Sequence, residues 1–109
     1  MVEYIVNLDS IFGSLADPTR RDILKRVALK ELSVNEIAAP YNITLAAVSK
    51  HLKILEKAKL IIKRRRGKQQ FVQLSPPAFQ NATEYLNYYE AIWNDRFDSL
   101  EQFLKEEKK

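Results

Sequence analysis

The sequence predicts a mainly helical fold with one small β-hairpin, in the order helix, helix, helix, helix, β, β, helix. Two observations carry this prediction. Apolar residues recur at helical spacing before residue 59 and after residue 76, and capping residues mark where the helices begin. Between residues 60 and 74 the period changes, and strand-forming residues flank a glycine turn. With 109 residues and no flexible linker, the chain is expected to form a single domain over 1–109.

The first two helices are predicted over residues 3–15 and 18–29. The apolar residues of the first recur three or four apart: Ile5, Leu8, Ile11, Phe12 and Leu15. Asp17-Pro18 then combines an N-cap residue with a proline at the first helical position, which is typical of a helix start. Ile23, Leu24 and Val27 form the apolar face of this second helix.

Two further helices follow with a tight connection between them. Ser33 and Glu36 form a capping-box pattern that begins a short helix over 34–39, which must end near Pro40. Thr44 caps the next helix, roughly 45–58, whose buried stripe is Val48, Leu52 and Leu55. These lengths are those of a helix-turn-helix.

A basic hairpin follows over residues 60–74. Leu60, Ile61 and Ile62 lead into Lys63-Arg64-Arg65-Arg66, Gly67-Lys68 forms the tip, and Phe71, Val72 and Leu74 belong to the returning strand. No strand is expected before this hairpin. The helices and hairpin together predict a winged helix-turn-helix.

The last helix begins after Ser75-Pro76-Pro77 and carries an apolar stripe: Leu86, Tyr89, Trp93, Phe97, Leu100 and Leu104. The first and last helices carry more apolar surface than a chain of this size easily hides, so we expect them to form a homodimer interface. The alternative is that both stripes fill an intramolecular core. The residues expected in the interface are Leu8, Ile11, Phe12, Leu15, Tyr85, Tyr89, Trp93, Phe97, Leu100 and Leu104.

The positive charge is concentrated in one stretch. Residues 50–68 hold nine basic groups and one acidic group, whereas the whole chain has a net charge of only +4. Such a stretch indicates binding to a polyanion, with an acidic membrane surface as a weaker alternative. Combined with a helix-turn-helix, it predicts double-stranded DNA, with the helix near 44–58 in the major groove and the hairpin on the backbone or minor groove. The residues expected to contact DNA are Thr44, Ala46, Ala47, Ser49, Lys50, His51, Lys53, Arg64, Arg65, Arg66 and Lys68, with Ser49 and Lys50 as the main base readers.

Three segments resemble the ArsR-type (arsenical-resistance-like) repressors of bacteria and archaea. They are Leu15-Ala16-Asp17-Pro18-Thr19-Arg20-Arg21-Asp22-Ile23-Leu24, the stretch from Val48 to Ala58, and Leu60-Ile61 with Arg64 to Lys68. The resemblance implies a homodimeric regulator, usually a repressor released by an effector. Lys59 stands where this family commonly has glycine, and a left-handed backbone there costs a lysine about 1 kcal/mol more than a glycine.

Composition excludes several chemistries. The chain has no cysteine and a single histidine, His51, so the Cys/His metal sensors of the family have no counterpart here, and we expect no metal and no cofactor. Asp98 and Glu101 could share a hard cation, but a solvated face is favoured. Tyr85, Tyr88, Tyr89 and Trp93 could line a pocket for an unknown small-molecule effector, although a dimer core is the preferred interpretation.

Other functional classes fit the sequence less well. The enzyme hypothesis is weak, because the sequence has no cysteine nucleophile, no second histidine, no phosphate-cradling glycine loop and no paired carboxylates outside helical surfaces. With no apolar run of membrane-spanning length, a cytoplasmic protein is expected. A non-regulatory architectural or RNA-binding winged helix remains the alternative, although Phe71 is the only hairpin aromatic available for base stacking.

Overall fold

The computed structural model describes the backbone of residues 2–107 and the side chains of residues 8–106. Ile5, which the sequence places in the first helix's apolar stripe, lies outside the described side chains. The chain divides into two compact units, Met1–Phe79 and Gln80–Lys109.

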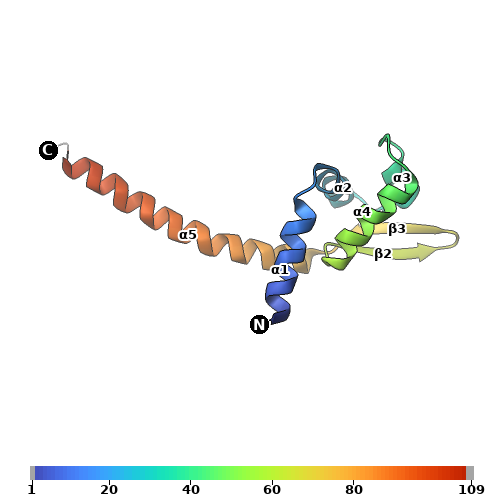
Figure 1. Ribbon diagram of the computed structural model, residues 1–109, viewed down its shortest axis with the longest axis horizontal. Coiled ribbons are helices and arrows are strands. Elements are labelled where there is room, and N and C mark those ends of the chain that lie inside the picture. Colours follow the sequence, from blue (N-terminus) through green and yellow to red (C-terminus); the bar gives the residue numbers. More distant parts are fainter. Residues whose placement is uncertain (1, 108–109) are drawn as a thin grey trace. The chain divides into compact units, whose positions relative to one another are not determined.

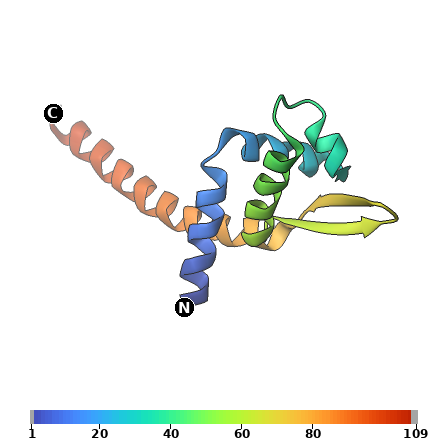
Figure 2. The same cartoon turned by 45° about the vertical axis from the view of Figure 1, so that its right-hand side comes forward.

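The N-terminal unit contains the predicted helices and hairpin (Figures 1 and 2). Its helices are α1 (Val2–Leu15), α2 (Pro18–Leu29), α3 (Val34–Ala38) and α4 (Leu45–Lys57), its strands are β1 (Leu32–Ser33), β2 (Ile61–Arg66) and β3 (Gln69–Leu74), and α5 (Pro76–Glu107) begins at its end. The mainly helical fold with a small hairpin is therefore confirmed, and the helix bounds agree with those predicted to within two residues.

The prediction that no strand precedes the hairpin is wrong. Leu32 and Ser33 form β1, which pairs antiparallel with β3, so that the sheet order is β1-β3-β2. Leu32 lies opposite Val72, and Ser33 lies opposite Phe71. A strand of two residues is too short to show an alternating pattern, so only the long-range pairing reveals it. This pairing attaches the start of α3 to the hairpin.

The core of the N-terminal unit lies where α1, α2 and α4 pack together above the sheet. α1 packs against both α2 and α4, and α4 also contacts α3 and β2. The largest fully buried apolar side chains come from nearly every element: Ile11, Ile23, Ile37, Val48, Leu52, Leu55, Leu60 and Val72. The predicted buried faces of α2 and α4 are thus confirmed.

The three predicted N-caps are formed. The Asp17 carboxylate accepts the Arg20 backbone N–H at 3.0 Å, and the Thr44 hydroxyl accepts that of Ala47 at 3.1 Å. Ser33 and Glu36 form a complete capping box, each side chain accepting the other residue's backbone N–H. These donated hydrogen bonds stabilise the carboxylates and lower the pKa of Asp17 below 3.8 and that of Glu36 below 4.5.

The lowered pKa values of Asp17 and Glu36 predict a loss of stability in acid. A carboxyl with a depressed folded pKa stabilises the fold above its unfolded pKa, and this contribution disappears as the pH falls through the folded pKa. We expect the urea midpoint to fall between about pH 6 and about pH 3, and to fall less in Asp17→Asn, which caps without titrating. If the urea midpoint of Asp17→Asn fell with pH as much as that of the unmodified chain, Asp17 would be excluded as a source of the acid sensitivity.

Lys59, which stands where glycine is common in the family, adopts a left-handed backbone at the end of α4. Lys59 has a φ of 63°, in the left-handed region. Its N–H donates to the Glu56 carbonyl at 2.9 Å, and that of Leu60 donates to the Leu55 carbonyl at 3.1 Å. This pair of bonds is the Schellman motif, in which glycine normally occupies the position of Lys59. The buried Leu60 and Leu55 hold the turn in place despite the strain.

We therefore expect Lys59→Gly to raise the free energy of unfolding by about 1 kcal/mol, because glycine adopts a positive φ without a steric penalty. Lys59→Ala is the matched control, since it removes the same charged side chain but keeps the Cβ that causes the strain. Urea unfolding measures both variants. Equal stability of the two would mean that the gain does not come from the backbone.

The C-terminal unit is the greater part of α5 and carries the apolar stripe predicted for it. Within the stripe (Leu86, Tyr89, Trp93, Phe97, Leu100 and Leu104), Trp93 is 57% exposed and Phe97 is 58% exposed. Their rings stack with centroids 5.7 Å apart. The spacing of three, four and four residues repeats after eleven and keeps the stripe nearly parallel to a straight helix axis. No described helix is both long enough and apolar enough to cross a membrane.

Candidate nucleic-acid interface

The helix-turn-helix is braced by side chains from α2. Arg26 donates to the carbonyls of Glu36 and Ile37, both at 2.8 Å, at the end of α3. Its guanidinium also lies 5.3 Å from the centroid of the Tyr41 ring, in the turn between α3 and α4. The Tyr41 hydroxyl donates to the Asp22 carboxylate. Burial and this hydrogen bond raise the pKa of Tyr41 above 10, so the hydroxyl stays a donor at neutral pH.

Sequence reasoning missed Arg26, Tyr41 and Asp22. Asp22 and Arg26 lie one turn apart on α2, but Tyr41 belongs to the turn before α4, so only the packing of α2 against that turn brings the three together. Their contacts hold the turn that sets the direction of α4. We infer a positioning role for them, since each is engaged within the chain.

α4 buries one face and presents the other. Val48, Leu52 and Leu55 are fully buried, and Thr44 caps the first turn. The remaining residues predicted to contact DNA lie on the outer face or at its edge: Ala46, Lys50 and Lys53 are exposed, whereas Ala47 and Ser49 are partly exposed. The small side chains at the start of α4 permit close approach to a groove, and the lysines add positive charge along it.

His51 is the member of the predicted DNA set that faces inward. Its Nδ1 lies 3.2 Å from Nη1 of Arg20 and 3.9 Å from the Asp17 carboxylate. Arg20 also donates through Nε to the Ser14 carbonyl at 2.7 Å. A guanidinium only donates, so Nδ1 of His51 is the acceptor in this hydrogen bond. The contact joins α4 to the α1–α2 junction; DNA contact by His51 stays a prediction.

The hairpin cations fall into two groups. Lys63 pairs with Glu56 of α4 at 3.6 Å between Nζ and Oε1, and Arg66 pairs with Glu31. The Arg66 guanidinium also lies 4.8 Å from the centroid of the Phe71 ring. Arg66 therefore crosses β3 to reach the residue before β1, and it fastens the hairpin to the rest of the sheet.

Arg64, Arg65 and Lys68 form the second group. All three are exposed, and none makes an ion pair with any residue whose side chain the structure describes. Arg65 only donates through Nε to the Gly67 carbonyl at 3.3 Å. Gly67 itself has a φ of 61°, which suits glycine at the first turn position of a two-residue hairpin. These three cations are free to contact phosphates.

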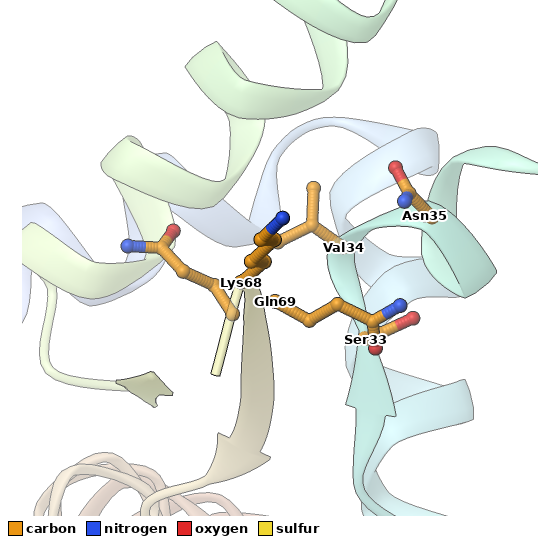
Figure 3. A pocket seen from close by; sticks show the side chains of 6 residues that line it. Ser33, Val34, Asn35, Lys68 and Gln69 are labelled. Atoms are coloured by element: carbon orange, nitrogen blue, oxygen red, sulfur yellow. The ribbon is translucent and has the colours of Figure 1, made fainter. Parts of the chain in front are cut away.

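A small polar pocket lies between the hairpin tip and the start of α3 (Figure 3). Lys68, Gln69 and Gln70 line one side, and Ser33, Val34 and Asn35 line the other. The β1–β3 pairing sets Ser33 opposite Phe71, which brings the start of α3 to this end of β3. It brings the ammonium of the hairpin tip close to the helix-turn-helix, so both elements present hydrogen-bonding groups to the same neighbourhood.

The described residues contain no group of three or more His, Cys, Asp or Glu side chains that could hold a metal ion. Asp98 and Glu101, the pair considered for a hard cation, belong to α5, where Glu101 instead pairs with Lys105 at 3.4 Å.

Known proteins resemble this chain in both fold and sequence. Residues 15–64 match a family described as a helix-turn-helix domain. The transcriptional repressor SdpR of Bacillus subtilis is 30% identical over 81% of this chain and 99% of its own length. A crystal structure of an ArsR family transcriptional regulator, RHA00566, has a TM-score of 0.77 and 30% identity, covering 81% of this chain and 91% of its own. The chain belongs to the ArsR family of transcriptional regulators.

Other relatives match less of the sequence or only the fold. The regulator Rv2034 of Mycobacterium tuberculosis is 41% identical over 62% of this chain, and the match spans 64% of Rv2034. An ArsR-like regulator from Rhodococcus sp. RHA1 has a TM-score of 0.75 at 23% identity, covering 91% of this chain and 93% of its own, and shows the common fold. This ArsR-family chain is thus a transcriptional regulator with a helix-turn-helix domain.

Proposed function

We propose that the chain is a cytoplasmic, homodimeric repressor that binds specific sites in double-stranded DNA and performs no enzymatic reaction. Two observations support this proposal: α4 exposes its outer face, and the hairpin cations Arg64, Arg65 and Lys68 make no ion pair with any described side chain. The pairing of β1 with β3 joins the start of α3 to the same hairpin. α4 would lie in the major groove, and the hairpin would follow the backbone or the minor groove.

Base reading is assigned to the start of α4. Ser49 is partly exposed and Lys50 is exposed there, and their hydroxyl and ammonium groups can bond base edges. Ala46 can contact a thymine methyl. The polar pocket beside Lys68 supports a backbone contact, because its ammonium and amide groups are donors of the kind that phosphates accept.

The experiment is selection of bound sequences from a randomised duplex pool, followed by affinity measurements on the selected site and on a scrambled duplex. We expect Lys50→Ala to weaken binding to the selected site by about tenfold, since a good base contact discriminates by roughly 1–3 kcal/mol. The affinity for the scrambled duplex should change little. Lys57→Ala is the matched control, because it removes an exposed lysine from the last turn of the same helix. Equal losses on both duplexes would contradict base reading by Lys50.

Dimerisation is proposed through the α5 stripe. Several large apolar side chains are about half exposed along this helix in the single chain, an arrangement that normally marks an interface. From α1, Phe12 and Leu15 are partly exposed and stay candidates. Leu8 is 7% exposed and Ile11 is 0% exposed, so both already serve the chain's own core, and their place in an interface stays a prediction.

Repression is the mode that the resemblance to SdpR supports, because that relative is named a repressor. A promoter carrying the selected site, placed before a reporter, should be silenced by the protein. Reporter activity that rises instead would mean activation. A response that needs no specific site would support the alternative of an architectural nucleic-acid-binding protein.

A further inference from the structure

An apolar pocket of about 350 Å³ opens on the N-terminal unit, on the flank of α2 that faces away from the turn before α4. Leu15 at the end of α1, Leu74 at the end of β3 and Phe79 near the start of α5 form its walls. Leu24 lies against it and is only 5% exposed. Its size lies within the range of small-molecule sites, and its lining is almost wholly apolar apart from two side chains.

Those two side chains are both cations. Arg21 and Lys25 lie one turn apart on α2, and with Leu24 and Ala28 they make up the face of α2 that borders the pocket. Arg21 is anchored by a hydrogen bond from Nη1 to the Leu15 carbonyl at 2.8 Å, which leaves its other donors unused. Lys25 makes no ion pair with any described side chain.

No described carboxylate makes an ion pair with Arg21 or Lys25. Asp17 accepts a hydrogen bond from the Arg20 backbone N–H, and Asp22 accepts one from the Tyr41 hydroxyl. The pocket therefore combines apolar walls with two positive charges that have no ion-pair partner among the described side chains. An anion with an apolar body complements both features, because its hydrocarbon part is removed from water while its charge meets donors on the rim.

We propose that this pocket binds a small carboxylate with an apolar body, of the size of a medium-chain carboxylic acid. The apolar part lies among Leu15, Leu74 and Phe79, and the carboxylate is held by Arg21 and Lys25. Octanoate-type binding at this pocket does not depend on DNA binding. Only the role of the pocket as an effector site rests on the proposed function. The route for such an effect is direct, because Leu74 pairs with Ile61 at the base of the hairpin.

The test measures octanoate binding to the full chain by calorimetry in the absence of DNA, so that its failure says nothing about DNA binding. We expect Lys25→Gln and Arg21→Gln each to weaken the binding of octanoate by about tenfold, since each variant removes a charge-assisted contact. Octanol, which has the same body without the charge, should bind at least about tenfold more weakly than octanoate. Equal binding of octanol and octanoate would overturn the assignment of the two cations.

A pocket-filling variant locates the site. Ala28→Phe places a ring in the pocket from an exposed position of α2 and should abolish octanoate binding. Leu29→Phe is the matched control, since Leu29 is 83% exposed, adjoins Ala28 and does not line the pocket. It should bind octanoate as the unmodified chain does. Undiminished binding by Ala28→Phe, or no binding by the unmodified chain, would overturn the proposal.

Discussion

Replacing Arg64 and Arg65 together by alanine is expected to weaken binding to every duplex by about 100-fold per protomer at low salt, because each replaced arginine gives up a charge-assisted phosphate contact that contributes about tenfold in affinity. Both side chains are exposed and neither makes an ion pair with a described side chain. The salt dependence should flatten as well, with a slope smaller by about 2 for each protomer, since fewer counterions are released. Titrations of labelled duplexes over a range of salt concentrations measure both effects.

The control variant removes one arginine and one lysine from α5 in place of the two hairpin arginines. Arg96 and Lys105 lie on α5, and Lys105 is an exposed member of an ion pair with Glu101. Their double replacement by alanine should leave both affinity and salt slope nearly unchanged. An equal loss in the two double variants would show that net charge, not the hairpin, governs binding.

Arg66 is expected to behave differently from its neighbours. Its guanidinium pairs with Glu31 and lies over the Phe71 ring, so Arg66→Ala should loosen the hairpin as well as remove a charge. Glu31→Gln tests this separation, because it weakens the same link without removing any cation from the hairpin. A reduced affinity in Glu31→Gln would indicate that hairpin position matters, whereas an unchanged affinity would indicate that Arg66 acts by charge alone.

Trp93→Glu is expected to convert the proposed dimer into monomers, with a dimer dissociation constant raised by at least about 1,000-fold. Trp93 lies in the middle of the α5 stripe, where its ring stacks on Phe97. Losing a buried tryptophan costs roughly 3–5 kcal/mol, and a symmetric interface loses the ring from both copies. Sedimentation over a range of concentrations measures the shift, and affinity for the selected DNA site should fall with it.

Ala91→Glu is the matched control for this prediction. Ala91 is an exposed residue of the same helix on the face opposite the stripe, so the variant adds the same charge without touching the proposed seam. It should remain dimeric. If Trp93→Glu also remained dimeric, the α5 stripe would not be the seam, and the interface would have to lie on the N-terminal unit.

Much of the fold could be predicted because its signals are local. Asp17, Ser33 and Thr44 cap the helices that they were predicted to cap, since a capping side chain reaches only three residues along the chain. The buried stripe of α4 follows from helical spacing alone. The concentration of charge over residues 50–68 is likewise visible in the sequence.

The site was only partly predictable. The sequence indicates that five hairpin cations exist, but it does not distinguish Lys63 and Arg66, which pair with Glu56 and Glu31, from Arg64, Arg65 and Lys68. It also groups His51 with the outward residues of α4, whereas the ring lies against Arg20. Each difference depends on a partner far away in the chain.

By itself, therefore, the sequence determined the helices, their caps, the hairpin and the location of the positive charge, because these depend on spacing and short-range hydrogen bonds. Only the tertiary structure decided that two residues, Leu32 and Ser33, form a strand, and that this strand joins the start of α3 to the hairpin. It also decided which cations are free and that Arg21 and Lys25 border an apolar pocket. Those features come from pairing and packing between distant segments, which no local pattern records.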